Sequence, residues 1–183
     1  MTEIALPDPQ PYDRVQRSFH WGMAAIIIVA LVIGLAGSFL VPGTPLRRAL
    51  LEWHKSLGLT ALALVVLRIA YRLATRNAPA HEAGPAARAA AHAAHLALYG
   101  LMLGMPLTGY LYSGAGGYSL PWFGLFQWPR LVPLDEALSA LGASLHAFGA
   151  DALYAVLGLH LLAVIWHQFV RRDRVLARMW PRR

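Results

Sequence analysis

Residues 145–160 read LHAFGADALYAVLGLH and carry two histidines fourteen positions apart, His146 and His160. An α-helix has about 3.6 residues per turn, so fourteen residues make nearly four whole turns and place both imidazoles on one face. The helical rise separates them by about 21 Å. The surrounding stretch, from about 138 to 170, is interrupted only by one acid, Asp151. We therefore expect one membrane-spanning helix that carries an imidazole near each side of the bilayer.

The rest of the chain repeats this apolar pattern. Of its 183 residues, 57% are hydrophobic and only 14% are charged, whereas soluble domains carry about 25% charged residues. This composition excludes an ordinary soluble enzyme and a disordered chain. A bilayer-spanning helix needs about 20 mainly apolar residues, and four such spans are predicted, at about 14–41, 51–73, 91–112 and 138–170. The predicted fold class is all-α, an integral membrane four-helix bundle in a single domain.

The positive residues indicate how the bundle lies in the membrane. Twelve of the sixteen Lys and Arg residues fall on one side of an even-numbered bundle, in the two tails and the second connection. Because positive loops stay in the cytoplasm, both termini are expected to be cytoplasmic. The other four residues face outward: Arg47, Arg48, Lys55 and Arg130. This distribution explains the net charge of +7 without nucleic-acid binding, and no nucleic-acid partner is expected.

Four of the eight histidines form two pairs by depth. His20, at the cytoplasmic end of the first span, matches the level of His160, and His54, at the outer end of the second, matches the level of His146. Two imidazoles from facing helices are what a haem iron needs on the two sides of its plane. The spacing therefore favours two b-type haems. The rival is a His-based proton or metal-ion pathway, because transporters also use intramembrane histidines.

Residues at matching levels support the haem interpretation. Fourteen residues after His20 comes Gly34, which lacks a side chain and would admit a macrocycle at the outer level. Fourteen residues after His54 comes Arg68, at the inner level, where a membrane-embedded cation needs an anionic partner such as a haem propionate. Gly58, one turn after His54, is expected to clear space beside the outer haem.

The remaining four histidines are not expected to bind haem iron. His95 and His167 both fall at the cytoplasmic end and are candidates to line a quinone or proton site. His81 and His92 are expected to be surface or packing residues. There is no cysteine in the chain, which excludes disulfides, iron–sulfur clusters, thiolate haem ligation and cysteine catalysis.

The longest connection, residues 113–140, is rich in aromatic residues and prolines. Trp and Tyr favour the headgroup layer of a bilayer, so this segment is expected to lie along the outer membrane surface. The alternative is that it forms a lid over a substrate site.

Several motifs occur in order along the chain: Arg17-Ser18-Phe19-His20-Trp21, Trp53-His54-Lys55-Ser56-Leu57-Gly58, Leu67-Arg68, Tyr71-Arg72, His92-x-x-His95 with Tyr99, Pro106 before Gly109, Pro121-Trp122-Phe123, Leu145-His146 and Gly158-Leu159-His160. In these residues the chain resembles the bacterial cytochrome b561 family over nearly its whole length. The resemblance implies a multi-pass protein of the bacterial inner membrane with two b haems. It implies His20 and His160 as axial ligands of the inner haem, and His54 and His146 as those of the outer one.

Within that family the sequence resembles the superoxide oxidase branch. The resemblance implies an oxidoreductase that takes electrons from superoxide at the periplasmic face and passes them to ubiquinone. Arg47, Lys55 and Arg130 would then attract the anionic donor, although they are equally explained as ordinary loop charges. A different role within the same fold is the haem-b membrane anchor of a larger dehydrogenase or hydrogenase, with a soluble redox subunit as partner.

Overall fold

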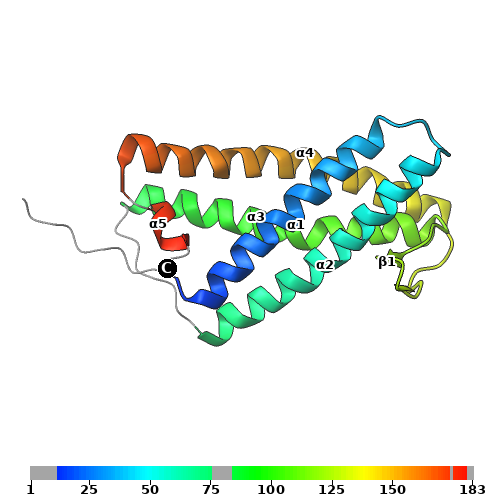
Figure 1. Cartoon of the computed structure of the whole chain (residues 1–183), viewed down its shortest axis with the longest axis horizontal. Helices are drawn as coiled ribbons and strands as arrows, with labels where there is room; N and C mark the ends of the chain where they lie inside the picture. The colour runs from blue at the N-terminus through cyan, green and yellow to red at the C-terminus, as the bar shows by residue number, and fades with distance from the viewer. Residues whose placement is uncertain (1–11, 76–83, 174, 181–183) are drawn as a thin grey trace, which may run out of the picture.

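Four long helices form the molecule in the computed structural model, which describes residues 12–75, 84–173 and 175–180. They are α1 (Arg14–Ser38), α2 (Pro45–Thr75), α3 (Pro85–Ala115) and α4 (Glu136–Trp166), and they lie along one another in an elongated bundle (Figure 1). Each is long and apolar enough to cross a membrane. The prediction of four spans is therefore confirmed. Arg76, His81, Arg174, Arg182 and Arg183 lie outside the described residues.

Three of the helices, α2, α3 and α4, begin before the apolar stretches from which they were predicted. α2 begins at Pro45 rather than near 51, and α3 begins at Pro85 rather than near 91. Proline suits the first turn of a helix, where its missing N–H is not needed, and the alanines after Pro85 favour helix without adding much hydropathy. α3 ends at Ala115, where Gly116 caps it and Gly117 takes a positive φ of 75°. α1 is shorter than predicted and ends at Ser38.

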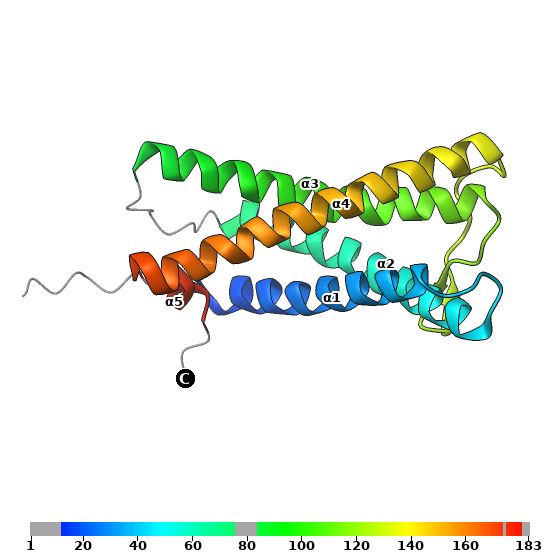
Figure 2. The ribbon, with the colours of Figure 1, turned by 90° about the horizontal axis from the view of Figure 1, so that it is seen from above.

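The helices pack as neighbours in chain order, α1 on α2, α2 on α3 and α3 on α4 (Figure 2). Glycine permits the closest approach of α3 and α4. A Cβ added at Gly142 would lie 2.6 Å from the backbone nitrogen of Tyr112, and one at Gly149 would lie 2.5 Å from the Met105 sulfur. Small residues at helix contacts are a common device in membrane bundles, because they bring the backbones together.

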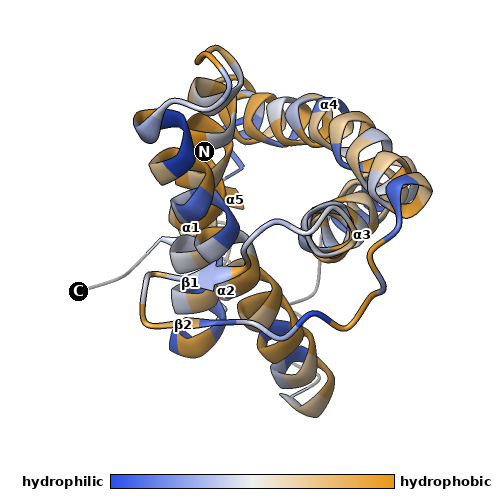
Figure 3. Cartoon of the chain, turned by 90° about the vertical axis from the view of Figure 1, so that its right-hand side faces the viewer, coloured by the Kyte–Doolittle hydropathy of each residue, from blue (hydrophilic) through white to orange (hydrophobic). Residues whose placement is uncertain are grey.

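Most apolar side chains face outward, as a membrane protein requires. Apart from Pro121, only six apolar side chains are buried among the described residues: Met23, Ala61, Val65, Ala115, Leu120 and Leu153. Large apolar residues on the spans are instead exposed, and hydrophobic residues run along the length of the helices (Figure 3). Val32, Leu96 and Leu159 are 61%, 75% and 66% exposed. The bilayer is the solvent that such a surface fits.

A small β-hairpin, which the sequence did not predict, closes the end of the bundle opposite the first and last described residues. We call this end the outer end and the opposite one the inner end, after the orientation expected from the sequence. β1 (Pro121–Trp122) pairs antiparallel with β2 (Phe126–Gln127) around a turn in which Phe123 and Gly124 take positive φ values of 49° and 74°. The hairpin lies against α2 (Figure 1). Ser56 of α2 accepts a hydrogen bond from the Phe123 N–H at 2.9 Å. The indole N–H of Trp122 donates to the Thr60 hydroxyl at 3.1 Å.

The C-terminal helix folds back onto the start of α1. After α4, a π-helical turn, η1 (His167–Arg171), leads to α5 (Val175–Met179). The last carbonyls of a helix have no partners within it, and those near the end of α5 accept hydrogen bonds from Arg17 and from the Trp21 indole at 2.9 and 2.8 Å. The first and last described residues therefore lie at the same end of the bundle (Figure 2).

Candidate functional site

Two imidazoles meet near the outer end of the bundle. His54 of α2 and His146 of α4 have ring centroids 5.9 Å apart and planes at 87°. The Nδ1 of His54 lies 2.8 Å from the Ala30 carbonyl oxygen, and that of His146 lies 3.0 Å from the Met105 carbonyl oxygen. An Nδ1–H that donates to a carbonyl leaves the Nε2 lone pair free, which is how metal-binding histidines are usually held.

Glycines make room for these two rings. A Cβ at Gly34 would lie 2.8 Å from Cε1 of His54, and a Cβ at Gly109 would lie 3.1 Å from Cε1 of His146. The space beside Gly34 is therefore taken by an imidazole, whereas the sequence predicted that it admits a macrocycle. Gly109 was not predicted as a site residue. Gly58 has no atom within 4 Å of an added Cβ.

Three imidazoles meet near the inner end. His20 of α1 lies 6.5 Å from His160 of α4, measured between ring centroids. His95 of α3 lies 6.0 Å from the same His160 ring. The sequence pairs His20 with His160 by depth, and the structure brings these two together. The structure also places His95 beside His160, which the sequence did not predict. One sequence does not fix the rotation of α3 about its axis, and this rotation decides which residues of α3 face His160. We call these three residues the inner imidazole cluster.

The ring separations suit one metal ion between two imidazoles. Each metal–nitrogen bond is about 2 Å long, and each ring centroid lies about 1 Å beyond the ligating nitrogen. Two imidazoles on opposite sides of one metal ion therefore have ring centroids about 6 Å apart. Both pairs predicted from the sequence lie near this value. A donor set of imidazoles without thiolates is also the set that b-type haem iron uses. In the described part of the chain, no group of three or more His, Asp or Glu side chains is arranged to hold a metal ion by itself.

Arg68 of α2 lies beside the inner imidazole cluster. It is within electrostatic reach of His20, His95 and His160. One guanidinium nitrogen lies 4.0 Å from the Met23 sulfur, and the guanidinium lies over the Tyr99 ring at 5.7 Å. The ion pairs of the described residues all involve Asp173, so Arg68 has no acidic partner among them. A cation in a membrane span needs an anion, and a haem propionate fits this position.

His167 has different contacts from His95. Its Nδ1 lies 2.5 Å from a carboxylate oxygen of Asp173, and Arg171 lies 3.7 Å from the same oxygen. Arg172, between them, takes a left-handed φ of 53° that turns the chain toward α5. His95 thus belongs to the inner imidazole cluster, and His167 belongs to this ion-pair group. A quinone or proton site that these two histidines line together stays a prediction.

Of the three cations predicted to attract the anionic donor, two bond to backbone carbonyls of neighbouring segments. The Arg47 Nε–H donates to the Gly37 carbonyl at the end of α1 at 3.2 Å. The Lys55 ammonium donates to the Ser119 carbonyl at 2.9 Å and lies 5.6 Å from the Tyr118 ring centroid. Arg130 is exposed. All three lie at the end of the bundle that carries His54.

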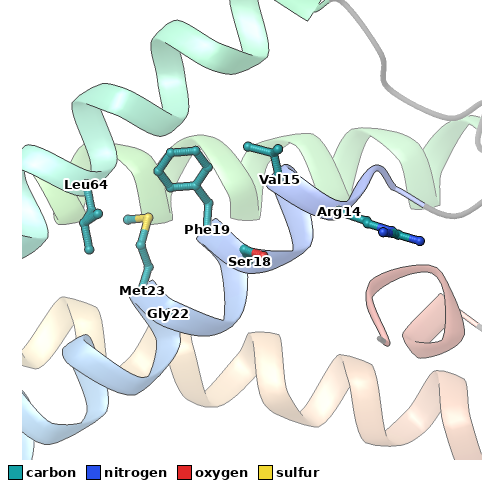
Figure 4. A pocket seen from close by; sticks show the side chains of 7 residues that line it. All are labelled: Arg14, Val15, Ser18, Phe19, Gly22, Met23 and Leu64. Carbon is teal, nitrogen blue, oxygen red and sulfur yellow. The ribbon is translucent and has the colours of Figure 1, made fainter. Parts of the chain in front are cut away.

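A pocket of about 380 Å³ lies on the α1–α2 side of the inner end and was not predicted from the sequence (Figure 4). Phe19, Met23 and Leu64 form its apolar part, and Arg14 lies at one end. Met23 also contacts Arg68. This buried methionine therefore lines the pocket and also touches the arginine that lies beside the inner imidazole cluster.

Comparison with known proteins identifies the family. The model of the family described as prokaryotic cytochrome b561 matches residues 11–182. The chain belongs to this family. Membership implies a multi-pass membrane protein that binds haem b and takes part in electron transport, and it confirms the resemblance found in the sequence motifs.

Individual relatives of this cytochrome b561 chain align over nearly their whole length. Cytochrome b561 homolog 2 of Escherichia coli (strain K12) is 30% identical over 172 residues, which cover 93% of this chain and 92% of that protein. Cytochrome b561 homolog 1 of the same organism is 26% identical over 174 residues, with coverage of 94% and 98%. The probable superoxide oxidase CybB of Yersinia pestis is 29% identical over 174 residues, with coverage of 94% and 97%.

Proposed function

We propose that this chain is a di-haem b-type cytochrome of the bacterial inner membrane that relays electrons from superoxide, a periplasmic donor, to ubiquinone. The observation that carries the proposal is the pair of imidazole sites near opposite ends of one bundle, with ring separations of 5.9 and 6.5 Å. His54 and His146 would hold the outer haem, and His20 and His160 the inner one. Bound haem with two imidazole ligands supplies one-electron transfer, because neither axial position is open.

The choice of donor is supported by charge and by one relative. Arg47, Lys55 and Arg130 give the outer end a positive field, and such a field raises the arrival rate of an anion. A relative with 29% identity is named a probable superoxide oxidase. The reaction balances when two superoxide anions each lose one electron to give two O₂. One ubiquinone then takes both electrons and two protons to give ubiquinol.

The orientation in this proposal follows from the loops. The ends of the described chain meet at one end of the bundle, where α2 ends and α3 begins (Figure 1). The exposed Arg72 lies in the last turn of α2, and the exposed Arg88 lies near the start of α3. The excess of Lys and Arg at this end favours a cytoplasmic location. The end with the hairpin and His54 would then face the periplasm, where the donor arrives.

The test is superoxide-driven ubiquinol formation by the purified protein in lipid nanodiscs. We expect ubiquinol to accumulate when superoxide is generated, and to stop accumulating when superoxide dismutase is added. The His54→Ala variant, which lacks one outer imidazole, is expected to form little ubiquinol. Haems that dithionite reduces but superoxide does not would contradict superoxide as the donor. Haems that superoxide reduces without ubiquinol formation would contradict ubiquinone as the acceptor.

A further inference from the structure

Tyr99 of α3 carries a buried hydroxyl group without a hydrogen-bond partner in the described part of the chain. Its oxygen is buried, and no hydrogen-bond partner lies near it among the described residues. A buried hydroxyl in an apolar environment is costly unless it is hydrogen-bonded. The phenol group is therefore a candidate to donate to a ligand that lies inside the bundle.

A second donor, whose one hydrogen-bond acceptor among the described residues is weak, faces the same ring. The guanidinium of Arg68, from α2, lies 5.7 Å from the centroid of the Tyr99 ring. The only hydrogen bond of this side chain within the described structure runs to the Met23 sulfur at 4.0 Å, and a thioether is a weak acceptor. A hydroxyl from α3 and a cation from α2 thus lie close together without a strong acceptor between them.

The location of these two donors points to the class of ligand. Tyr99 follows His95 by four residues, so it lies on the same helix face about 6 Å along the axis. Arg68 is within electrostatic reach of all three residues of the inner imidazole cluster. Tyr99 therefore lies on the side of this cluster toward the middle of the bilayer, and the Arg68 guanidinium approaches its ring from α2. A ligand there would have to carry oxygen acceptors and negative charge.

We propose that the Tyr99 hydroxyl is a haem-binding group, which shares with Arg68 one propionate carboxylate of the haem at the inner imidazole cluster. The proposal rests on the proposed function, because it requires a haem on His160. A carboxylate has two oxygens and accepts several hydrogen bonds, so it can satisfy both donors together. Hydrogen bonds to a charged acceptor are the strong ones, and a low dielectric strengthens them.

The experiment compares Tyr99→Phe with the wild-type protein, each purified at full length with its haems. Tyr154→Phe is the matched control, because the Tyr154 hydroxyl lies on α4 and donates only a long bond of 3.5 Å to the Leu31 carbonyl. Two properties are measured: the rate of haem transfer from the inner site to apomyoglobin, and the carboxylate bands in redox-difference infrared spectra of protein with ¹³C-labelled propionates. Neither readout depends on turnover.

We expect Tyr99→Phe to shift a labelled propionate band and to speed haem release from the inner site about tenfold, the effect of losing one hydrogen bond to a charged group. Tyr154→Phe is expected to change neither. Combining Tyr99→Phe with Arg68→Gln should give less than the sum of the two separate effects, since both residues bind the same carboxylate.

An unchanged band and an unchanged release rate in Tyr99→Phe would overturn the proposal and indicate that a buried water satisfies the hydroxyl. Fully additive effects of the two substitutions would overturn the shared carboxylate. These outcomes leave the proposed function intact as long as the wild-type protein holds both haems. A wild-type protein without an inner haem would instead contradict the proposed function and this inference together.

Discussion

His54 and His146 are held differently from His20 and His160. The outer two rings are bonded through Nδ1 to the carbonyls of Ala30 and Met105, whereas neither inner ring has such a bond among the described residues. A ring fixed by a carbonyl has a fixed tautomer and orientation. The outer pair is therefore preorganised by the backbone, and the inner pair depends on its neighbours.

The inner imidazole cluster poses a choice of ligand that substitution decides. His20 and His95 lie at similar distances from His160, at 6.5 and 6.0 Å. We expect His20→Ala to lose the inner haem and His95→Ala to keep it, because His20 lies at the matching depth. Haem content per chain in the two purified variants measures this. If His95→Ala loses the haem and His20→Ala keeps it, His95 is the axial ligand opposite His160.

Gly34 and Gly58 form a matched pair for the outer site. A Cβ at Gly34 would lie 2.8 Å from the His54 ring, whereas a Cβ at Gly58 would meet nothing within 4 Å. We expect Gly34→Ala to displace the ring, at a cost of about 1–3 kcal/mol for overpacking, and to lower the content of outer haem. Gly58→Ala should retain it. The absorbance spectra of the two variants provide the measurement, and equal haem content would show that the His54 ring has room to move.

At the scale of elements, one buried hydroxyl contributes directly to holding the hairpin on α2. Ser56 is 1% exposed and accepts from the N–H of Phe123, a residue with positive φ. Ser56→Ala should leave that N–H without its partner, at a cost of about 1–3 kcal/mol, and loosen the hairpin on α2. Ser144→Ala is the control, since its hydroxyl bonds only within its own helix, to the Ala140 carbonyl. Hydrogen exchange at residues 121–127 should quicken in the first variant alone. Equal exchange would contradict this role for Ser56.

The four spans could be predicted from the sequence, whereas the hairpin and the docking of α5 could not. Hydropathy located all four spans because each is a local run of apolar residues. The hairpin has strands of only two residues, and its position depends on bonds to Ser56 and Thr60, more than 60 positions away. The docking of α5 depends likewise on Arg17 and Trp21 at the opposite end of the chain. Such contacts leave no periodic signal in a single sequence.

The candidate site, too, could be predicted from the sequence only in part. The pairs His20–His160 and His54–His146 were predictable because antiparallel helices convert sequence spacing into depth. Depth does not fix rotation about a helix axis, so the inward position of His95 and the contact of Gly109 with His146 emerged only in the structure. Arg47 and Lys55 were predicted either to attract the anionic donor or to be ordinary loop charges, and the structure gives each of them a carbonyl partner.

For the whole molecule, the charge asymmetry predicts a salt-dependent reaction. The Debye length falls from about 30 Å at 0.01 M salt to about 10 Å at 0.1 M. The rate of haem reduction by superoxide should therefore fall as salt is added, if the outer cations steer the anion. Arg130→Gln should lower the rate at low salt several-fold, and Arg88→Gln, an exposed cation at the other end of the bundle, should leave it unchanged. A rate independent of salt would contradict steering.

The central claim is that one chain holds two haems, each between two imidazoles from facing helices. Haem quantification with an absorbance spectrum of the purified protein tests it most directly. We predict two b haems per chain with low-spin bands, falling to one in His54→Ala, which keeps the inner haem, and to one in His20→Ala, which keeps the outer haem. A colourless protein, or a single haem lost in both variants, would contradict the account.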